Sequence, residues 1–181
     1  VPRKGFDKTI SAWARVRAAH PDAQLVIIGD GPQRAELQAL ADASGVAGSI
    51  TLTGAVSDAD LLSAYRSASL FVMPNRTMPD GDTEGFGLVF LEANACGRAV
   101  IGGRAGGAVE AVRDGESGLL VNGENVDEIA DAIMQVLGDD AMRARLESGG
   151  LKHAQANSWA NRVRIFQDLC RKLQSKGEHN V

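Results

Sequence analysis

The chain has 181 residues, 44% of them hydrophobic and 23% charged, which excludes an intrinsically disordered protein and fits a single domain. The formal net charge of −4 gives no reason to expect nucleic acid as a partner, and no apolar run reaches the ~18 residues of a membrane helix. Two cysteines, Cys96 and Cys170, are too few for a disulfide framework, so we expect a cytoplasmic protein.

The chain begins with Val1-Pro2-Arg3-Lys4-Gly5 and enters a helical pattern without a preceding strand. Phe6, Ile10 and Trp13 follow the three- and four-residue spacing of a helix that Pro21 ends. A doubly wound sheet needs a strand ahead of this helix. The sequence therefore predicts that residues 1–181 form one domain, and that its first strand is missing with an N-terminal portion of the protein.

Five short apolar runs bounded by turn residues predict strands, and helical patterns separate them. The predicted strands are Gln24–Ile28, Ile50–Thr53, Leu70–Met73, Ala99–Ile101 and Gly118–Val121. The next predicted helix has Pro32 in its first turn and stops near Gly45, and the clearest amphipathic helix covers 126–138. This alternation predicts an α/β fold, a doubly wound parallel sheet with helices on both faces, whose ligands bind beyond the carboxyl ends of the strands.

Two turns resemble ligand motifs only in part. Gly29-Asp30-Gly31-Pro32 lacks the third glycine of a dinucleotide fingerprint, because Arg34 stands there, which disfavours an NAD-dependent oxidoreductase. Asp80-Gly81-Asp82 could hold a divalent metal, or it could be an exposed turn. We favour the turn and expect no metal site.

The segment from Glu84 to Glu92 carries the most information. Its glycines, Gly85 and Gly87, allow close backbone approach to a ligand where a helix starts, and free N–H groups there favour phosphate. Glu84 is expected just outside this helix and Glu92 within its first two turns. Both glutamates could instead have structural roles. Glu84 could be an exposed carboxylate that interacts favourably with the helix dipole, and Glu92 could form an ion pair with an arginine on a neighbouring helix.

Further residues are predicted at the same edge of the sheet. Gly106, Gly107 and Glu110 follow the fourth predicted strand, and Lys4-Gly5 would follow the missing first one. In the last predicted helix, Trp159 and the apolar residues spaced after it share one side. The other side carries Arg162, Arg164, Arg171 and Lys172, and there a solvated face is favoured over membrane contact.

Taken in order, these motifs resemble the C-terminal, donor-binding domain of the retaining group 1 glycosyltransferases, sequence family 4, which have the GT-B fold. The resembling motifs are Lys4-Gly5-Phe6, Gly29-Asp30-Gly31-Pro32, the pair Glu84 and Glu92 around Gly-Phe-Gly, and Gly106-Gly107 with Glu110. The resemblance covers nearly the whole chain. It implies transfer of a sugar from a nucleoside diphosphate sugar to an acceptor hydroxyl, without a cofactor or a metal.

The resemblance also implies roles for single residues. Glu84 would hold donor-sugar hydroxyls beside the anomeric carbon, and Glu92 would bind ribose hydroxyls. The remaining donor-binding residues are Lys4 for the diphosphate, the backbone of Gly85, Phe86, Gly87 and Leu88 for phosphate and sugar, Gly31, and Val56 and Asp58 for the base. Arg3 is not expected to be the second phosphate-binding residue.

The partners implied are the nucleoside diphosphate sugar and an N-terminal acceptor domain of the same protein. Through that domain the protein could contact the inner face of a membrane peripherally. Without that domain, this chain is expected to be inactive. The alternative function is a non-catalytic nucleotide or sugar-phosphate binding module that regulates a partner.

Overall fold

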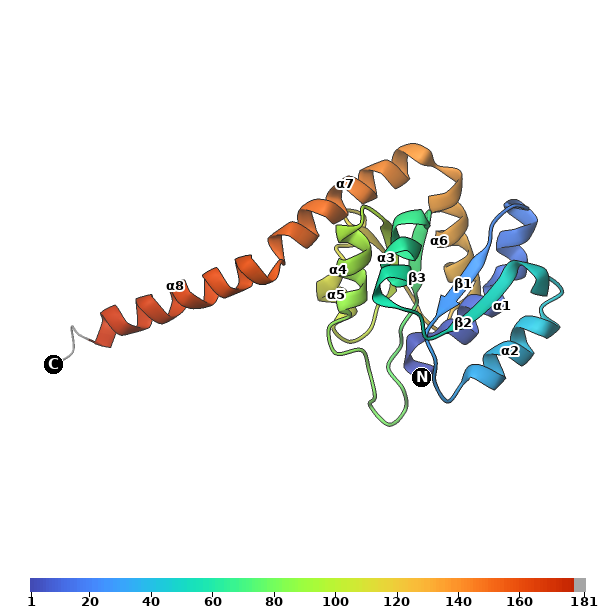
Figure 1. Ribbon diagram of the computed structural model, residues 1–181, viewed down its shortest axis with the longest axis horizontal. Helices are drawn as coiled ribbons and strands as arrows, with labels where there is room; N and C mark the ends of the chain where they lie inside the picture. The colour runs from blue at the N-terminus through green and yellow to red at the C-terminus, as the bar shows by residue number, and fades with distance from the viewer. Residues whose placement is uncertain (178–181) are drawn as a thin grey trace.

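The computed structural model describes residues 1–177 as strands and helices in alternation (Figure 1). The strands are β1 (Leu25–Ile28), β2 (Ile50–Gly54), β3 (Leu70–Met73), β4 (Ala99–Gly103) and β5 (Gly118–Val121). The helices are η1 (Pro2–Lys4), α1 (Phe6–Ala19), α2 (Arg34–Ala43), η2 (Ala47–Ser49), α3 (Asp58–Ser67), α4 (Leu88–Ala95), α5 (Ala108–Ala111), α6 (Val126–Gly138), α7 (Asp140–Ala156) and α8 (Trp159–Gly177).

All of the strand pairs are parallel, and the strands form two sheets in the orders β1-β2 and β3-β4-β5. The predicted α/β fold is thus confirmed, with its strands divided between two sheets. All five predicted strands form, with limits within two residues of those expected. Pro32 is a correction, because α2 begins only at Arg34 and Pro32 lies in the turn before it.

Helices cover both faces of the β3-β4-β5 sheet, and side-chain alternation along β4 explains why. Ala99 and Ile101 belong to a large core with α1 and α6, whereas Val100 packs with Phe90 of α4 and Ala108 of α5 in a second core. All five residues of β4 are buried, which is typical of a central parallel strand.

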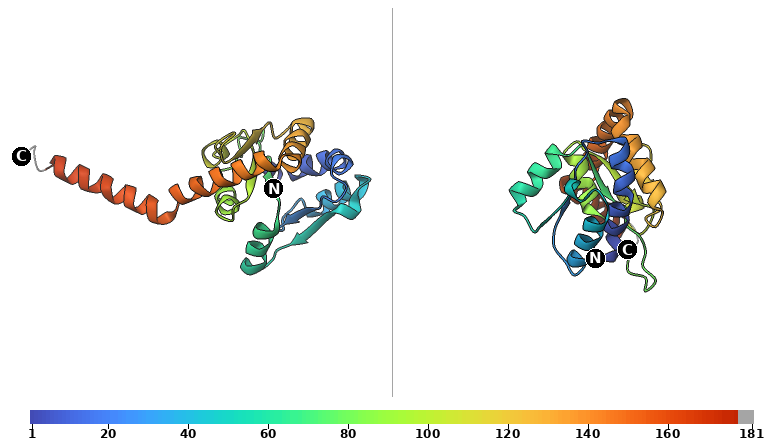
Figure 2. Two further views of the ribbon diagram at one scale, coloured as in Figure 1. Left: turned by 90° about the horizontal axis from the view of Figure 1, so that it is seen from above. Right: turned by 90° about the vertical axis from the view of Figure 1, so that its right-hand side faces the viewer.

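The last helix, α8, leads away from this body, as Figure 2 shows from above, whereas α7 packs on it with Leu146 and Ala154 buried. α8 carries apolar side chains on an unpacked surface, and Trp159 and Phe166 are 78% and 66% exposed. No helix among residues 1–177 is long and apolar enough to cross a membrane.

Candidate functional site

The candidate site is built where the chain leaves β3 and β4. η1 lies against the loop that follows β3, because Gly5 adopts a left-handed φ of 74° and has no side chain. A Cβ atom at Gly5 would lie only 2.1 Å from the Pro74 carbonyl oxygen. This close approach holds η1, and Lys4 within it, against the carboxyl end of β3.

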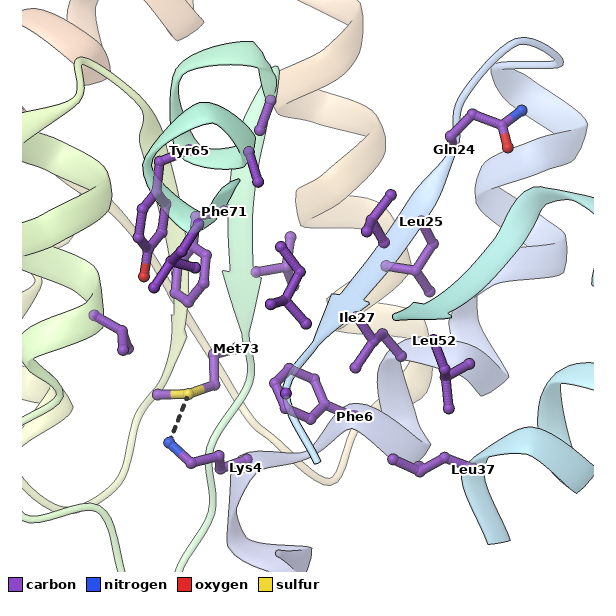
Figure 3. Close-up of a pocket in the computed structure, with 18 of the residues that line it drawn as sticks. Lys4, Phe6, Gln24, Leu25, Ile27, Leu37, Leu52, Tyr65, Phe71 and Met73 are labelled. Atoms are coloured by element: carbon purple, nitrogen blue, oxygen red, sulfur yellow. Dashed lines mark hydrogen bonds between the residues drawn. The ribbon is translucent and has the colours of Figure 1, made fainter. Parts of the chain in front are cut away.

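Glu84 and two basic residues of η1 form an ion cluster at this edge. Lys4 Nζ lies 3.5 Å from Glu84 Oε2 and 3.6 Å from Met73 Sδ at the end of β3, the second contact being visible in Figure 3. Arg3 Nε lies 3.9 Å from Glu84 Oε2, and the other end of its guanidinium pairs with Asp82 at 3.1 Å. The fold therefore brings Lys4 and Glu84 together across 80 residues of sequence.

The paired glycines after β4 hold the backbone of this segment. The Gly107 N–H donates to the Glu84 carbonyl oxygen at 2.9 Å. A Cβ atom at Gly107 would lie 2.1 Å from the Gly85 carbonyl oxygen, and one at Gly106 would lie 2.4 Å from that of Glu84. Only glycine at both positions lets the turn after β4 contact the backbone of Glu84 and Gly85. Gly106 and Gly107 therefore hold the Glu84 segment in place without being site residues themselves.

Helix α4 begins at this contact with its first N–H groups open. Its N-cap is Gly87, with a left-handed φ of 80° and no side-chain cap, and Glu84 lies three residues before that cap. The first N–H groups of a helix have no intrahelical acceptor, and the helix dipole adds positive potential there. Gly85 and Leu88 are exposed beside it, with Phe86 half-buried. The arrangement is suited to an anion.

Glu92 lies on the second turn of α4 and accepts a hydrogen bond from the Tyr65 hydroxyl of α3 at 3.1 Å. Burial raises the pKa of Tyr65 well above its usual value, and the negative charge and hydrogen bond of Glu92 add to this. Glu92 itself is exposed. The alternative of an ion pair between Glu92 and an arginine is wrong, because its partner is a neutral phenol.

The remaining predicted residues follow the strands of the β1-β2 sheet. Gly31 follows β1, Val56 follows β2, and Asp58 is the first residue of α3. Gly31 and Val56 line a cavity of about 910 Å³ together with Lys4 and Glu92. Asp58, Glu84 and residues 85–88 do not line it. Of the predicted residues, Lys4 belongs to both the cavity and the ion cluster, whereas Asp58 and residues 85–88 belong to neither.

Two buried polar residues that support the site had no signal in the sequence. The fully buried Asn75 accepts from the Gly103 N–H at 2.9 Å and donates to the Ala105 carbonyl at 2.8 Å, joining the β3 and β4 turns. Arg76 bonds both carboxylate oxygens of Asp7 in α1 at 3.0 Å. No local spacing could reveal these contacts, since their partners are 28 to 69 residues away.

The two aspartates of the predicted turn have partners, one within the loop and one in η1. Asp80 Oδ1 accepts from the Asp82 N–H at 3.0 Å, and the Asp82 carboxylate pairs with Arg3. Among residues 1–177 no group of three metal-ligating acidic, histidine or cysteine side chains is found.

The chain is similar to known proteins in both sequence and structure. A family model described as "Glycosyl transferases group 1" matches residues 1–153. The "GDP-mannose-dependent monoacylated alpha-(1-6)-phosphatidylinositol monomannoside mannosyltransferase" of Corynebacterium glutamicum is 41% identical over 161 residues, which are 88% of this chain and 42% of that protein. The chain thus spans less than half the length of this curated relative.

Solved structures show the same architecture. The sucrose-phosphate synthase of Thermosynechococcus elongatus matches with a TM-score of 0.80 at 30% identity, over 97% of this chain and 44% of that one. HepE of Anabaena, crystallised in complex with UDP, matches with a TM-score of 0.79 at 27% identity, over 97% of this chain and 46% of that one.

Proposed function

The chain belongs to the group 1 glycosyltransferases, and from this premise we propose that it is the donor-binding part of a retaining enzyme. The reaction is transfer of a sugar from a nucleoside diphosphate sugar to an acceptor hydroxyl. The observation that carries the proposal is the convergence of Lys4, Glu84 and the open N-terminus of α4 at the carboxyl ends of β3 and β4. An anion at this edge meets one ammonium group and several aligned N–H groups.

The proposed chemistry is electrostatic. Lys4 and the first turn of α4 stabilise the negative charge that develops on the leaving diphosphate as the glycosidic bond breaks. The Glu84 carboxylate lies 3.5 Å from the Lys4 ammonium group and balances its charge. With donor bound, the diphosphate takes over that ammonium group, and the Glu84 carboxylate turns to hydroxyls of the donor sugar.

We propose that Glu92 binds the ribose, with the Tyr65 hydroxyl holding its carboxylate in place. The base then lies toward Val56 and Asp58, and the phosphates toward Gly85 to Leu88. Binding needs no divalent metal in this scheme, since Asp82 already pairs with Arg3 and cations and helix N–H groups face the diphosphate. The named donor of the Corynebacterium relative makes GDP-mannose the first candidate donor.

Calorimetry with GDP, UDP, GDP-mannose and NAD tests the proposal. A nucleoside diphosphate should bind and NAD should not. Lys4→Met removes the ammonium group but keeps an unbranched chain, and should weaken nucleoside diphosphate binding by about 1.5–3 kcal/mol, roughly 10- to 150-fold.

Lys8→Met is the matched control for this experiment. Lys8 also comes from the N-terminal segment but pairs with Glu124 at 3.0 Å, away from the predicted site. Its loss should leave the affinity unchanged. Equal losses in the two variants, or tighter binding of NAD than of any nucleoside diphosphate, would contradict the proposal.

A further inference from the structure

A second concave site lies away from the predicted donor residues. Residues 113–117 form the turn before β5, so they lie at the amino end of that parallel strand, whereas Lys4 and Glu84 lie at the carboxyl ends of the sheet. This turn faces α7 across a pocket of about 460 Å³. We call it the α7 pocket, and it shares no lining residue with the cavity of about 910 Å³.

Close contact between α7 and the turn shapes the α7 pocket. A Cβ atom at Gly149 would lie only 2.0 Å from the Glu116 carbonyl oxygen, so a side chain there would push the helix away from the turn. Residues three and four apart share one face of a helix, and the face of α7 that lines the pocket consists of Arg145, Ser148, Gly149, Lys152, His153 and Ala156. Three of these residues are small, which leaves the space that the pocket occupies.

The α7 pocket gathers positive charge that the chain does not neutralise. Arg145 and Lys152 are exposed, and within the described residues neither side chain forms a hydrogen bond or an ion pair. Arg113 pairs with Glu116 at the long distance of 3.9 Å. The lining therefore carries three Lys or Arg side chains and one carboxylate, in a chain whose formal net charge is −4. Cations grouped in a concave site raise the local concentration of anions.

His153 shows independently that positive potential dominates this site. Its side chain is buried at the wall of the α7 pocket. Burial lowers the pKa of His153, and the Arg113 charge and, more weakly, the Arg162 charge lower it further. The carbonyl groups of Ala111 and Glu110 act in the opposite direction, but within residues 1–177 no carboxylate offsets the two arginines. An anion in the pocket would therefore stabilise the protonated form of His153.

We propose that the α7 pocket binds an anion that carries phosphate groups, at a site distinct from the one proposed for the donor. Guanidinium groups such as those of Arg113 and Arg145 offer paired N–H donors to phosphate oxygens, and the Lys152 ammonium group adds a point charge. A volume of about 460 Å³ lies toward the small end of ligand pockets and suits a pyrophosphate ion or a sugar phosphate. A free compound and a lipid headgroup both present this chemistry.

Calorimetry with inorganic pyrophosphate tests this site. The parent chain and Lys4→Met should both bind it saturably, because Lys4→Met removes only the ammonium group of the proposed donor site. In the Lys4→Met background, Arg145→Gln and Lys152→Met should each weaken this binding at least about tenfold, since each removes a charged donor from the pocket.

Arg66→Gln is the matched control for these variants. Arg66 of α3 is also exposed and without a hydrogen bond or ion pair among the described residues, but it lies outside the α7 pocket. Its replacement removes the same charge and should leave the affinity for pyrophosphate unchanged. Equal losses of affinity in Arg66→Gln and Arg145→Gln would overturn the proposal.

The titration of His153 shows whether the anion occupies this pocket. Proton NMR follows the imidazole signals of the chain, and His153→Gln identifies the signal that comes from His153. Saturating pyrophosphate should raise the pKa of His153 by at least about 0.5, because an anion beside the ring favours its protonated form. The double variant Arg145→Gln, Lys152→Met should lose this change. An unchanged pKa of His153 in the parent chain with saturating pyrophosphate would also overturn the proposal.

Vesicle sedimentation distinguishes the two sources of phosphate. Phosphatidylcholine vesicles with and without phosphatidic acid are mixed with the parent chain, Arg145→Gln and Arg66→Gln. Sedimentation that requires phosphatidic acid and is lost only in Arg145→Gln would assign the phosphate to a lipid headgroup. Pyrophosphate binding without such sedimentation would assign it to a free compound. Sedimentation lost equally in the two variants would count against the pocket, since it would reflect surface charge alone.

Discussion

Replacing Gly107 with alanine tests whether the contact between the β4 turn and the Glu84 segment supports the site. The Cβ atom would lie 2.1 Å from the Gly85 carbonyl oxygen, where ordinary contact begins at 3.4 Å, so backbone must move. The backbone of Gly107 has a φ of −73°, so the effect is steric rather than conformational.

The loss of unfolding free energy in Gly107→Ala has two contributions. Overpacking against rigid backbone costs about 1–3 kcal/mol, and losing the hydrogen bond from Gly107 to the Glu84 carbonyl adds about 0.5–1.5 kcal/mol. We expect a loss of about 2–4 kcal/mol in unfolding free energy. For a chain of this size that lowers the melting temperature by about 4–16 °C.

Gly85→Ala is the matched control, since Gly85 is the other partner of the same contact. A Cβ atom there meets nothing within 4 Å, and Gly85 is absent from the glycines with positive φ. Its unfolding free energy should stay within about 0.5 kcal/mol of the parent chain. Urea unfolding followed by circular dichroism compares the two, and equal stability of the two variants would refute the reasoning.

Three other outcomes are expected. Glu92→Gln should weaken the binding of a nucleoside diphosphate without its sugar by about 1–3 kcal/mol in calorimetry. Glu84→Gln should leave this binding nearly unchanged and should lower the turnover of a two-domain enzyme. Equal losses of nucleotide affinity in the two variants would contradict the two roles. Burial, and then the Arg113 charge, lower the pKa of His153 below its ordinary 6.5. The contribution of the neutral His153 to the unfolding free energy is therefore present above that pH and is lost as the pH falls. His153→Gln should flatten this loss of unfolding free energy in urea titrations from about pH 7 to about pH 5. EDTA and Asp82→Asn should each leave nucleotide affinity within about threefold of the parent value, and loss of binding in both would favour a metal site.

The sequence alone was sufficient for the five strands and for the edge at which Lys4 and Glu84 meet, but it did not predict α3 or α7. Strand residues are β-branched or apolar over four or five positions, and glycines mark the turns, so both signals are local. The limits of β3 and β5 follow directly from such runs. The placement of Lys4 and Glu84 at one edge followed from topology, because parallel strands end on the same side of a sheet.

Only the tertiary structure decided which side chains meet. The Arg76–Asp7 pair, the Asn75 link between two turns and the Tyr65 partner of Glu92 join elements that are far apart in sequence. Each residue type there fits many exposed positions equally well, and its partner depends on how helices pack on the sheets.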